Sequence, residues 1–171
     1  MSIRSALNAV PVWPVLVFVP LLTLGFGAFH YVPAYRTCGK LAEARVALTE
    51  SAARAAESPG SFLRMDQAVQ VADWDELRVI PAPKVDGKVL DCPFGWDLSG
   101  PDREVLFASG RMGIVAFARA GTAIDYIEYF RDQVRFEDVE GVIARPAAQF
   151  TVARPDSGEG PLILRQRPPG G

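Results

Sequence analysis

The feature that most constrains this chain is a run of 31 residues, Ser5–Tyr35, without a single Asp, Glu, Lys or Arg. Its central part, VPVWPVLVFVPLLTLGFGAFHYV, is almost wholly apolar. A helix that crosses a bilayer needs about 20 apolar residues. The sequence therefore predicts a transmembrane helix over residues 10–33, after a short N-terminal tail of residues 1–9. A cleaved signal peptide is the alternative, but the apolar part of such a peptide has only roughly 7–15 residues.

The residues after this run exclude several classes of function. The formal net charge of the chain is −2, and its acidic and basic residues are interspersed, so nucleic-acid binding has no electrostatic basis. The only histidine is His30, which leaves the rest of the chain without Ser-His or Cys-His catalysis and without histidine-ligated zinc. The sequence predicts no catalytic residue, no metal ligand and no cofactor, and it favours a protein that is not an enzyme.

Two cysteines, Cys38 and Cys92, carry the sharpest structural hypothesis. Neither lies in a CxxC motif or a Cys/His cluster, and a lone pair is typical of one disulfide in an oxidising compartment. A disulfide between them would stabilise the fold by on the order of 3–4 kcal/mol in the loop-entropy model. Two unrelated reduced thiols are the alternative.

The rest of the sequence predicts an α+β fold. Leu41, Ala44, Leu48 and Ala52 recur at helical spacing, which predicts a juxtamembrane amphipathic helix over residues 36–58. An α+β domain is expected over residues 61–166, with a four- or five-stranded antiparallel sheet and one or two helices, followed by a loose tail, residues 167–171.

Individual elements of this domain follow from alternation and turn signals. The segment ELRVIP predicts a strand that stops at Pro81, and AAQFTVAR and PLILRQ predict two more. The apolar runs in EVLFA and GIVAFA, joined by a glycine-containing connection, predict an antiparallel hairpin. The segments MDQAVQVAD and AGTAIDYIEYFRDQVRF predict helices, and the second would carry Asp125, Glu128 and Asp132 on a solvated face.

Two acidic groups and several aromatic residues are the remaining candidates for a site. Asp73, Asp75 and Glu76 form one group, and Glu137, Asp138 and Glu140 form the other. Neither has the spacing of a calcium loop, and solvated element ends explain both. Five aromatic residues are candidates for binding a protein partner: Trp74, Phe94, Trp96, Tyr126 and Tyr129. The Cys92–Trp96 loop is the first candidate among these segments.

The order of these motifs resembles a set of small uncharacterised bacterial proteins that are often secreted, lipid-anchored or membrane-anchored. They share a WD-x-V-x-x-PP-type opening, which matches Trp74-Asp75, and an F-x-V ending, which matches AAQFTVAR. The resemblance covers residues 73–154, and Lys84 stands where those proteins often have an aromatic residue. It implies an extracytoplasmic location and no particular activity.

Together these features suggest a single-pass protein of the bacterial cytoplasmic membrane. Its α+β domain would be extracytoplasmic and would bind a protein or another envelope component, although Arg36, Lys40 and Arg45 after the apolar run favour the opposite orientation. One alternative is an accessory subunit of a larger membrane complex, held by its transmembrane helix. A carboxylate- or thiol-dependent enzyme is the other.

Overall fold

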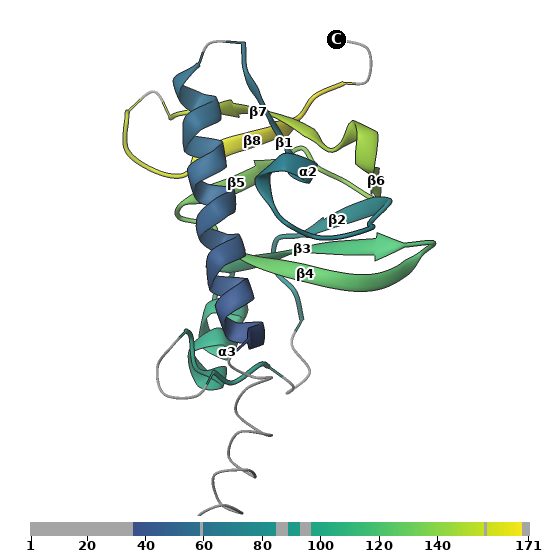
Figure 1. The fold of residues 1–171 in the computed structure, drawn as a ribbon. Helices are drawn as coiled ribbons and strands as arrows, with labels where there is room; N and C mark the ends of the chain where they lie inside the picture. Colours follow the sequence, from purple (N-terminus) through teal and green to yellow (C-terminus); the bar gives the residue numbers. More distant parts are fainter. Residues whose placement is uncertain (1–35, 59, 85–88, 93–96, 156, 169–171) are drawn as a thin grey trace, which may run out of the picture.

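The structure is a computed structural model that describes residues 36–58, 60–84, 89–92, 97–155 and 157–168. A long helix over residues 36–57 lies against two sheets (Figure 1). The remaining elements, in chain order, are β1 (Phe62–Arg64), α2 (Met65–Ala68), β2 (Glu76–Ile80), α3 (Gly100–Ala108), β3 (Met112–Arg119), β4 (Thr122–Phe130), β5 (Val134–Glu137), β6 (Ile143–Ala144), the 3-10 helix η3 (Arg145–Ala147), β7 (Gln149–Ala153) and β8 (Leu162–Gln166).

Within the described residues, each sheet has four strands. Sheet A has the order β1-β7-β8-β5, and all its pairs are antiparallel except β5 with β8, which is parallel. Sheet B has the order β4-β3-β2-β6 and is antiparallel throughout. Strands β3 and β4 are joined by Ala120 and Gly121, both with positive φ, which suits the tight turn of a twisted hairpin.

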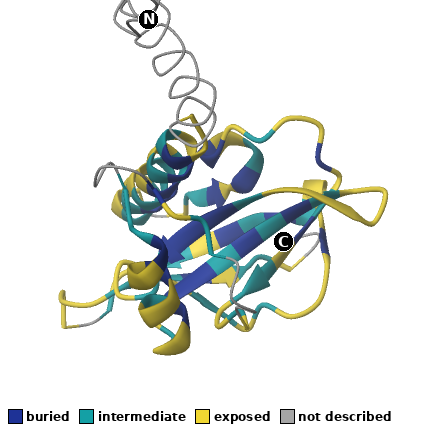
Figure 2. Cartoon of the chain, turned by 90° about the horizontal axis from the view of Figure 1, so that it is seen from below, coloured by how far each residue is buried: buried dark blue, intermediate teal, exposed yellow. Residues whose placement is uncertain are grey.

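The main core lies between the inner faces of the two sheets and the second half of the long helix. Alternation directs one set of side chains of each strand inward, and buried residues gather along the strands while the connections are exposed (Figure 2). From sheet A this core takes Leu63, Val134, Phe150, Leu162 and Leu164, from sheet B Leu77, Val115, Phe117, Ile127 and Tyr129, and from the helix Leu48 and Ala52.

A second buried group lies on the other face of sheet B. Met112 alternates with Val115 along β3 and therefore points away from the main core. It is buried together with Cys38, Leu41, Cys92 and Phe107, none of which belongs to the main core. The long helix contributes to both groups, because its buried positions 38, 41, 45, 48 and 52 form one stripe at three- and four-residue spacing.

The prediction of a membrane-spanning helix is corrected. The predicted segment, residues 10–33, lies outside the described residues. Within the described ranges, no helix combines the length and the apolar character needed to cross a bilayer. The long helix carries charged residues along its whole length, and α3 has only nine residues. The structure supports an α+β fold with two sheets in place of an anchor followed by one sheet.

Two element predictions were also wrong. The apolar run Val105–Phe107 lies in helix α3, which Ser99 caps: its hydroxyl accepts a hydrogen bond from the backbone N–H of Asp102. The predicted helix over residues 120–136 is instead β4 and β5. Strand β3 therefore forms its hairpin with β4 and not with the EVLFA segment, because the segment rich in β-branched and aromatic residues pairs along its whole length with β3.

Candidate functional site

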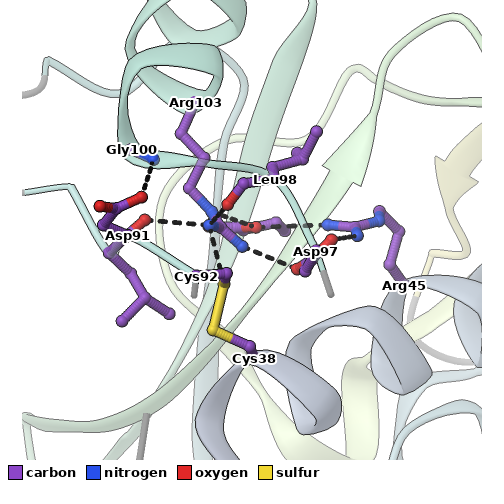
Figure 3. Close-up of a disulfide and its surroundings, with 10 residues drawn as sticks. Cys38, Arg45, Asp91, Cys92, Asp97, Leu98, Gly100 and Arg103 are labelled. Atoms are coloured by element: carbon purple, nitrogen blue, oxygen red, sulfur yellow. Dashed lines mark hydrogen bonds and ion pairs between the residues drawn. A yellow bond between two sulfur atoms is a disulfide. The ribbon is translucent and has the colours of Figure 1, made fainter. Parts of the chain in front are cut away.

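The predicted disulfide between Cys38 and Cys92 is confirmed, with 5.9 Å between the two Cα atoms. It joins the first described turn of the long helix to the segment between β2 and α3 (Figure 3). Both cysteines are buried. The disulfide therefore fixes this segment against the outer face of sheet B, where the second buried group lies.

Arg103 of α3 is the centre of a charge cluster beside this disulfide. We use this name for Arg45, Asp97, Arg103 and Glu128. The Nε atom of Arg103 donates to the carboxylate of Glu128 at 2.9 and 3.1 Å, and Nη2 donates to Oδ2 of Asp97 at 2.7 Å. The Nη1 atom donates to the carbonyl oxygens of Leu90 and Leu98 and lies 3.2 Å from Sγ of Cys92. One fully buried guanidinium thus contacts described residues on both sides of residues 93–96: Leu90 and Cys92 before them, Asp97 and Leu98 after them (Figure 3).

Arg45 of the long helix completes the cluster. It forms ion pairs with Asp97 and, at 3.3 Å, with Oε2 of Glu128. Its guanidinium also lies over the ring of Phe130, 5.0 Å from the centroid. Two cations and two carboxylates therefore balance formally, and each carboxylate contacts both arginines. This arrangement joins the long helix, α3, strand β4 and the Asp97 segment.

The carboxyl group of Glu128 has a pKa that is shifted by its surroundings. Burial raises the pKa of its carboxyl group, while the hydrogen bond and charge of Arg103 and the charge of Arg45 lower it. The net direction is upward, because removal of the carboxylate from water outweighs the two cations. The same Glu128 charge, after burial itself, contributes to the raised pKa of the neighbouring Tyr126.

Two properties of the charge cluster argue against a reaction at this site: its side chains are buried, and their polar groups already bind one another or the backbone. Arg103 and Glu128 are 0% and 1% exposed, so a substrate has no direct access to them. The donors of Arg103 are occupied by carboxylates and carbonyl oxygens of its own fold. A satisfied buried network of this kind specifies one packing arrangement of the surrounding elements.

The structure separates the five aromatic candidates for partner binding. Trp74 is 2% exposed and packs edge-to-face on Phe117, with 5.2 Å between the ring centroids. Tyr129 is 1% exposed and also belongs to the main core, whereas Tyr126 is half-buried on the outer face of sheet B. Phe94 and Trp96 lie outside the described residues. Partner binding by these residues stays a prediction.

The two acidic groups lie at strand ends of different sheets, the first at the start of β2 and the second at the end of β5. Asp75 accepts a hydrogen bond from the N–H of Ala120 at 2.9 Å and so holds the turn between β3 and β4. Glu137 pairs with Arg165 across β5 and β8 at 2.8 Å. In the ranges that the structure covers, no three of the His, Cys, Asp and Glu side chains are grouped so that they could hold a metal ion.

Sequence reasoning missed three members of the charge cluster as site residues and misjudged the fourth. It placed Glu128 on a solvated helix face, but this residue alternates with Ile127 and Tyr129 in β4 and is buried. For Arg45 a signal was present, because it occupies the helix stripe between Leu41 and Leu48, where an apolar residue is expected. Asp97 and Arg103 gave no comparable signal, since only the tertiary fold brings them to the disulfide.

Comparisons with known proteins add no functional assignment to this geometry. No protein-family model matches the chain, and no curated protein or solved structure matches it either. Its fold and its charge cluster therefore have to be interpreted from the contacts that they make.

Proposed function

We propose that the domain formed from residue 36 onward is a non-catalytic binding domain. In this proposal it acts in an oxidising, extracytoplasmic compartment and recognises a protein or another envelope component. The observation that carries the proposal is the buried Cys38–Cys92 disulfide with the charge cluster packed around it. Disulfides persist in oxidising compartments and are rare where thiols are kept reduced.

The contacts of the charge cluster support a scaffold and not a reaction centre. A catalytic acid or base must come within hydrogen-bond reach of its substrate. Glu128 and Arg103 instead satisfy one another inside the protein, and the cluster joins four segments that are distant in sequence. Because the cluster lies inside the domain, specificity for a partner would come from side chains on the surface.

Thiol trapping tests the compartment. Free thiols are blocked with N-ethylmaleimide at the moment of cell lysis, and the full chain is then purified and digested without reduction. We expect a Cys38–Cys92 linked peptide and no blocked cysteine. Blocked Cys38 and Cys92 in most molecules would overturn the proposed location.

Crosslinking in intact cells tests the binding function. A short amine-reactive crosslinker should give one dominant adduct of the full chain with a partner, and the adduct should decline strongly in the double variant Cys38→Ser/Cys92→Ser. If the wild-type chain gives only unlinked protein or a ladder of unrelated products, the binding function is wrong.

A further inference from the structure

A surface groove borders the free edge of sheet A. It has a volume of about 280 Å³ and lies between β1 and the last two turns of the long helix. Strand β1 follows the upper end of this helix along the chain (Figure 1), and residues of both elements line the groove. Ser51 and Arg54 line the groove from the helix, Ser58 from the bend that follows it, Phe62 and Arg64 from β1, and Gln67 from α2.

The backbone of β1 directs hydrogen-bonding groups away from its neighbour β7. In the β1–β7 pairing, Leu63 lies opposite Phe150 and Arg64 lies opposite Gln149. At the next position the N–H of Met65 donates to the carbonyl oxygen of Ala148, so this is a hydrogen-bonded pair. Because hydrogen-bonded and non-hydrogen-bonded pairs alternate in an antiparallel ladder, Phe62 and Arg64 point their backbone groups outward.

The next strand supports this assignment independently. The carbonyl oxygen of Gln149, opposite Arg64, accepts a hydrogen bond from the N–H of Arg167 at 2.8 Å and therefore faces away from β1. Strand β1 is the end strand of sheet A. Among the described residues, the N–H and C=O of Phe62 and the N–H of Arg64 therefore face an open edge, while Arg64 is the N-cap residue of helix α2, whose C=O accepts the first bond of that helix.

The side chains of the groove favour a negatively charged ligand. The side chain of Arg54 is 68% exposed and that of Arg64 is 44% exposed. Their acidic neighbours are Glu50, 3.7 Å from Arg54, and Asp66, 2.9 Å from Arg64, and neither acid lines the groove. Arg54 also donates to Ser51, and Arg64 donates to Asp66 through both Nε and Nη2. A guanidinium has five N–H donors, so both arginines keep donors for a ligand, beside the half-buried Phe62, whose ring also contacts the guanidinium of Arg167.

From this geometry we infer that the groove binds an extended, acidic peptide segment of a partner protein, which adds as a strand to the free edge of β1. Backbone hydrogen bonds from such an added strand supply affinity, and side-chain contacts supply specificity. Here Phe62 and Arg64 offer the backbone groups, and Arg54 and Arg64 read the carboxylates. This inference rests on the proposed binding function and names its partner class and its site.

The test selects peptides on the full chain with its disulfide intact. The probe is a phage-displayed library of random linear dodecapeptides, and one enriched peptide is then synthesised for binding measurements. We expect enriched sequences to combine acidic residues with alternating apolar ones. We also expect the peptide to slow hydrogen exchange at the Phe62 and Arg64 amides by at least about tenfold, which binding by charge alone would not do.

Two charge-reversal variants make a matched pair for this test. Arg54→Glu changes an exposed arginine inside the groove, whereas Arg119→Glu changes one at the far end of sheet B, 63% exposed and 3.9 Å from Asp73. Arg54→Glu should weaken peptide binding at least about fivefold, and Arg119→Glu should leave it unchanged. Denaturation midpoints of both variants show that each is folded.

Several outcomes would overturn the inference while the binding function stands. One is a cellular crosslink that Arg54→Glu and Arg119→Glu leave equally intact. Another is an enriched peptide that gives no protection at Phe62 and Arg64, or no enrichment at all over a matrix without protein. Self-association of the full chain that Arg54→Glu abolishes would assign the groove to a second copy and would likewise contradict it.

Discussion

At the residue scale, Arg103 does the most to hold the Cys92 segment in place. Its guanidinium is fully buried and makes ion pairs to Asp97 and Glu128 while it donates to two carbonyl oxygens of the same segment. A buried ion pair adds little net stability when compared with apolar packing, but the loss of one partner is costly because the other charge stays buried.

Replacement of Arg103 by Met should therefore destabilise the protein by about 3–5 kcal/mol, since Glu128 and Asp97 would lose their main counter-ion. Urea denaturation of the full chain measures this change. The control is Arg119→Met at an exposed pair with 3.9 Å between charges, which should change stability by less than about 1 kcal/mol. Equal effects of the two variants would contradict the role given to Arg103.

Tyr129 gives the fold a dependence on alkaline pH. Burial raises its pKa from 10.0 to about 12. Between these values the unfolded chain releases the phenolic proton and the folded chain keeps it, so the free energy of unfolding falls as the pH rises above 10. The full loss is roughly 2–3 kcal/mol.

Denaturation midpoints between pH 9 and pH 11 measure the first part of this loss. In Tyr129→Phe the decline should be much smaller, with a remainder from Tyr126, whose pKa is also raised by burial. A wild-type protein whose stability is constant across this range would show that the Tyr129 hydroxyl is not buried as described.

At the scale of elements, strand β3 depends on one close approach. A Cβ atom at Gly113 would lie 2.4 Å from Cζ and 2.5 Å from the hydroxyl oxygen of Tyr129, which stands opposite on β4. The ring of Tyr129 therefore occupies the space that a side chain at position 113 would need.

Gly113→Ala should destabilise the fold by about 1–3 kcal/mol, because Tyr129 must move within a packed core. Gly39→Ala is the matched control: position 39 is in the long helix with no atom within 4 Å of an added Cβ, and alanine there should stabilise by about 0.5–1 kcal/mol. Thermal unfolding of both variants measures whether each substitution lowers or raises the stability of the protein. A stabilising Gly113→Ala would refute the tight packing.

The same scale shows how far the sequence can predict this fold. The segments around Leu77, Phe150 and Leu164 have β2, β7 and β8 where alternation predicts strands, because the local pattern and the tertiary contacts agree. For the segments around Val105 and Ile127, the local sequence pattern and the tertiary contacts do not agree. Val105 belongs to an apolar run yet is 67% exposed on α3, and the spacing around Ile127 fits a helix until β3 offers it a partner.

The charge cluster could not be predicted for a related reason. Its members come from four segments, and the pairing of Arg103 with Glu128 depends on α3 being a helix and β4 a strand. The local pattern instead predicts a strand for the EVLFA part of α3 and a helix for the segment that forms β4. The disulfide was predictable, because it required only a count of two cysteines and no geometry.

At the scale of the whole molecule, the disulfide closes a long loop. Its cysteines are 54 positions apart, and the enclosed chain includes most of the long helix, β1, α2 and β2. Cross-linking restricts this chain in the unfolded state, which in the loop-entropy model is worth about 4 kcal/mol. It also keeps Asp97 next to both arginines.

The double variant Cys38→Ser/Cys92→Ser should therefore lose about 4 kcal/mol of stability in urea denaturation. Wild-type protein treated with a phosphine reductant should show the same loss, which separates the effect of the bond from that of the serines. A loss below about 1 kcal/mol in both samples would mean that the charge cluster alone holds the segment.

The position of β8 has a consequence for the order of events during synthesis. This strand is the last of the described strands in sequence order, yet it lies between β7 and β5 and pairs with both. Sheet A therefore cannot be completed until residues 162–166 have left the ribosome, although the helix and the β3–β4 hairpin can form earlier. A nascent chain stalled before Leu162 would leave unpaired the edges of β5 and β7 that face β8, and unpaired strand edges make folding intermediates prone to aggregation.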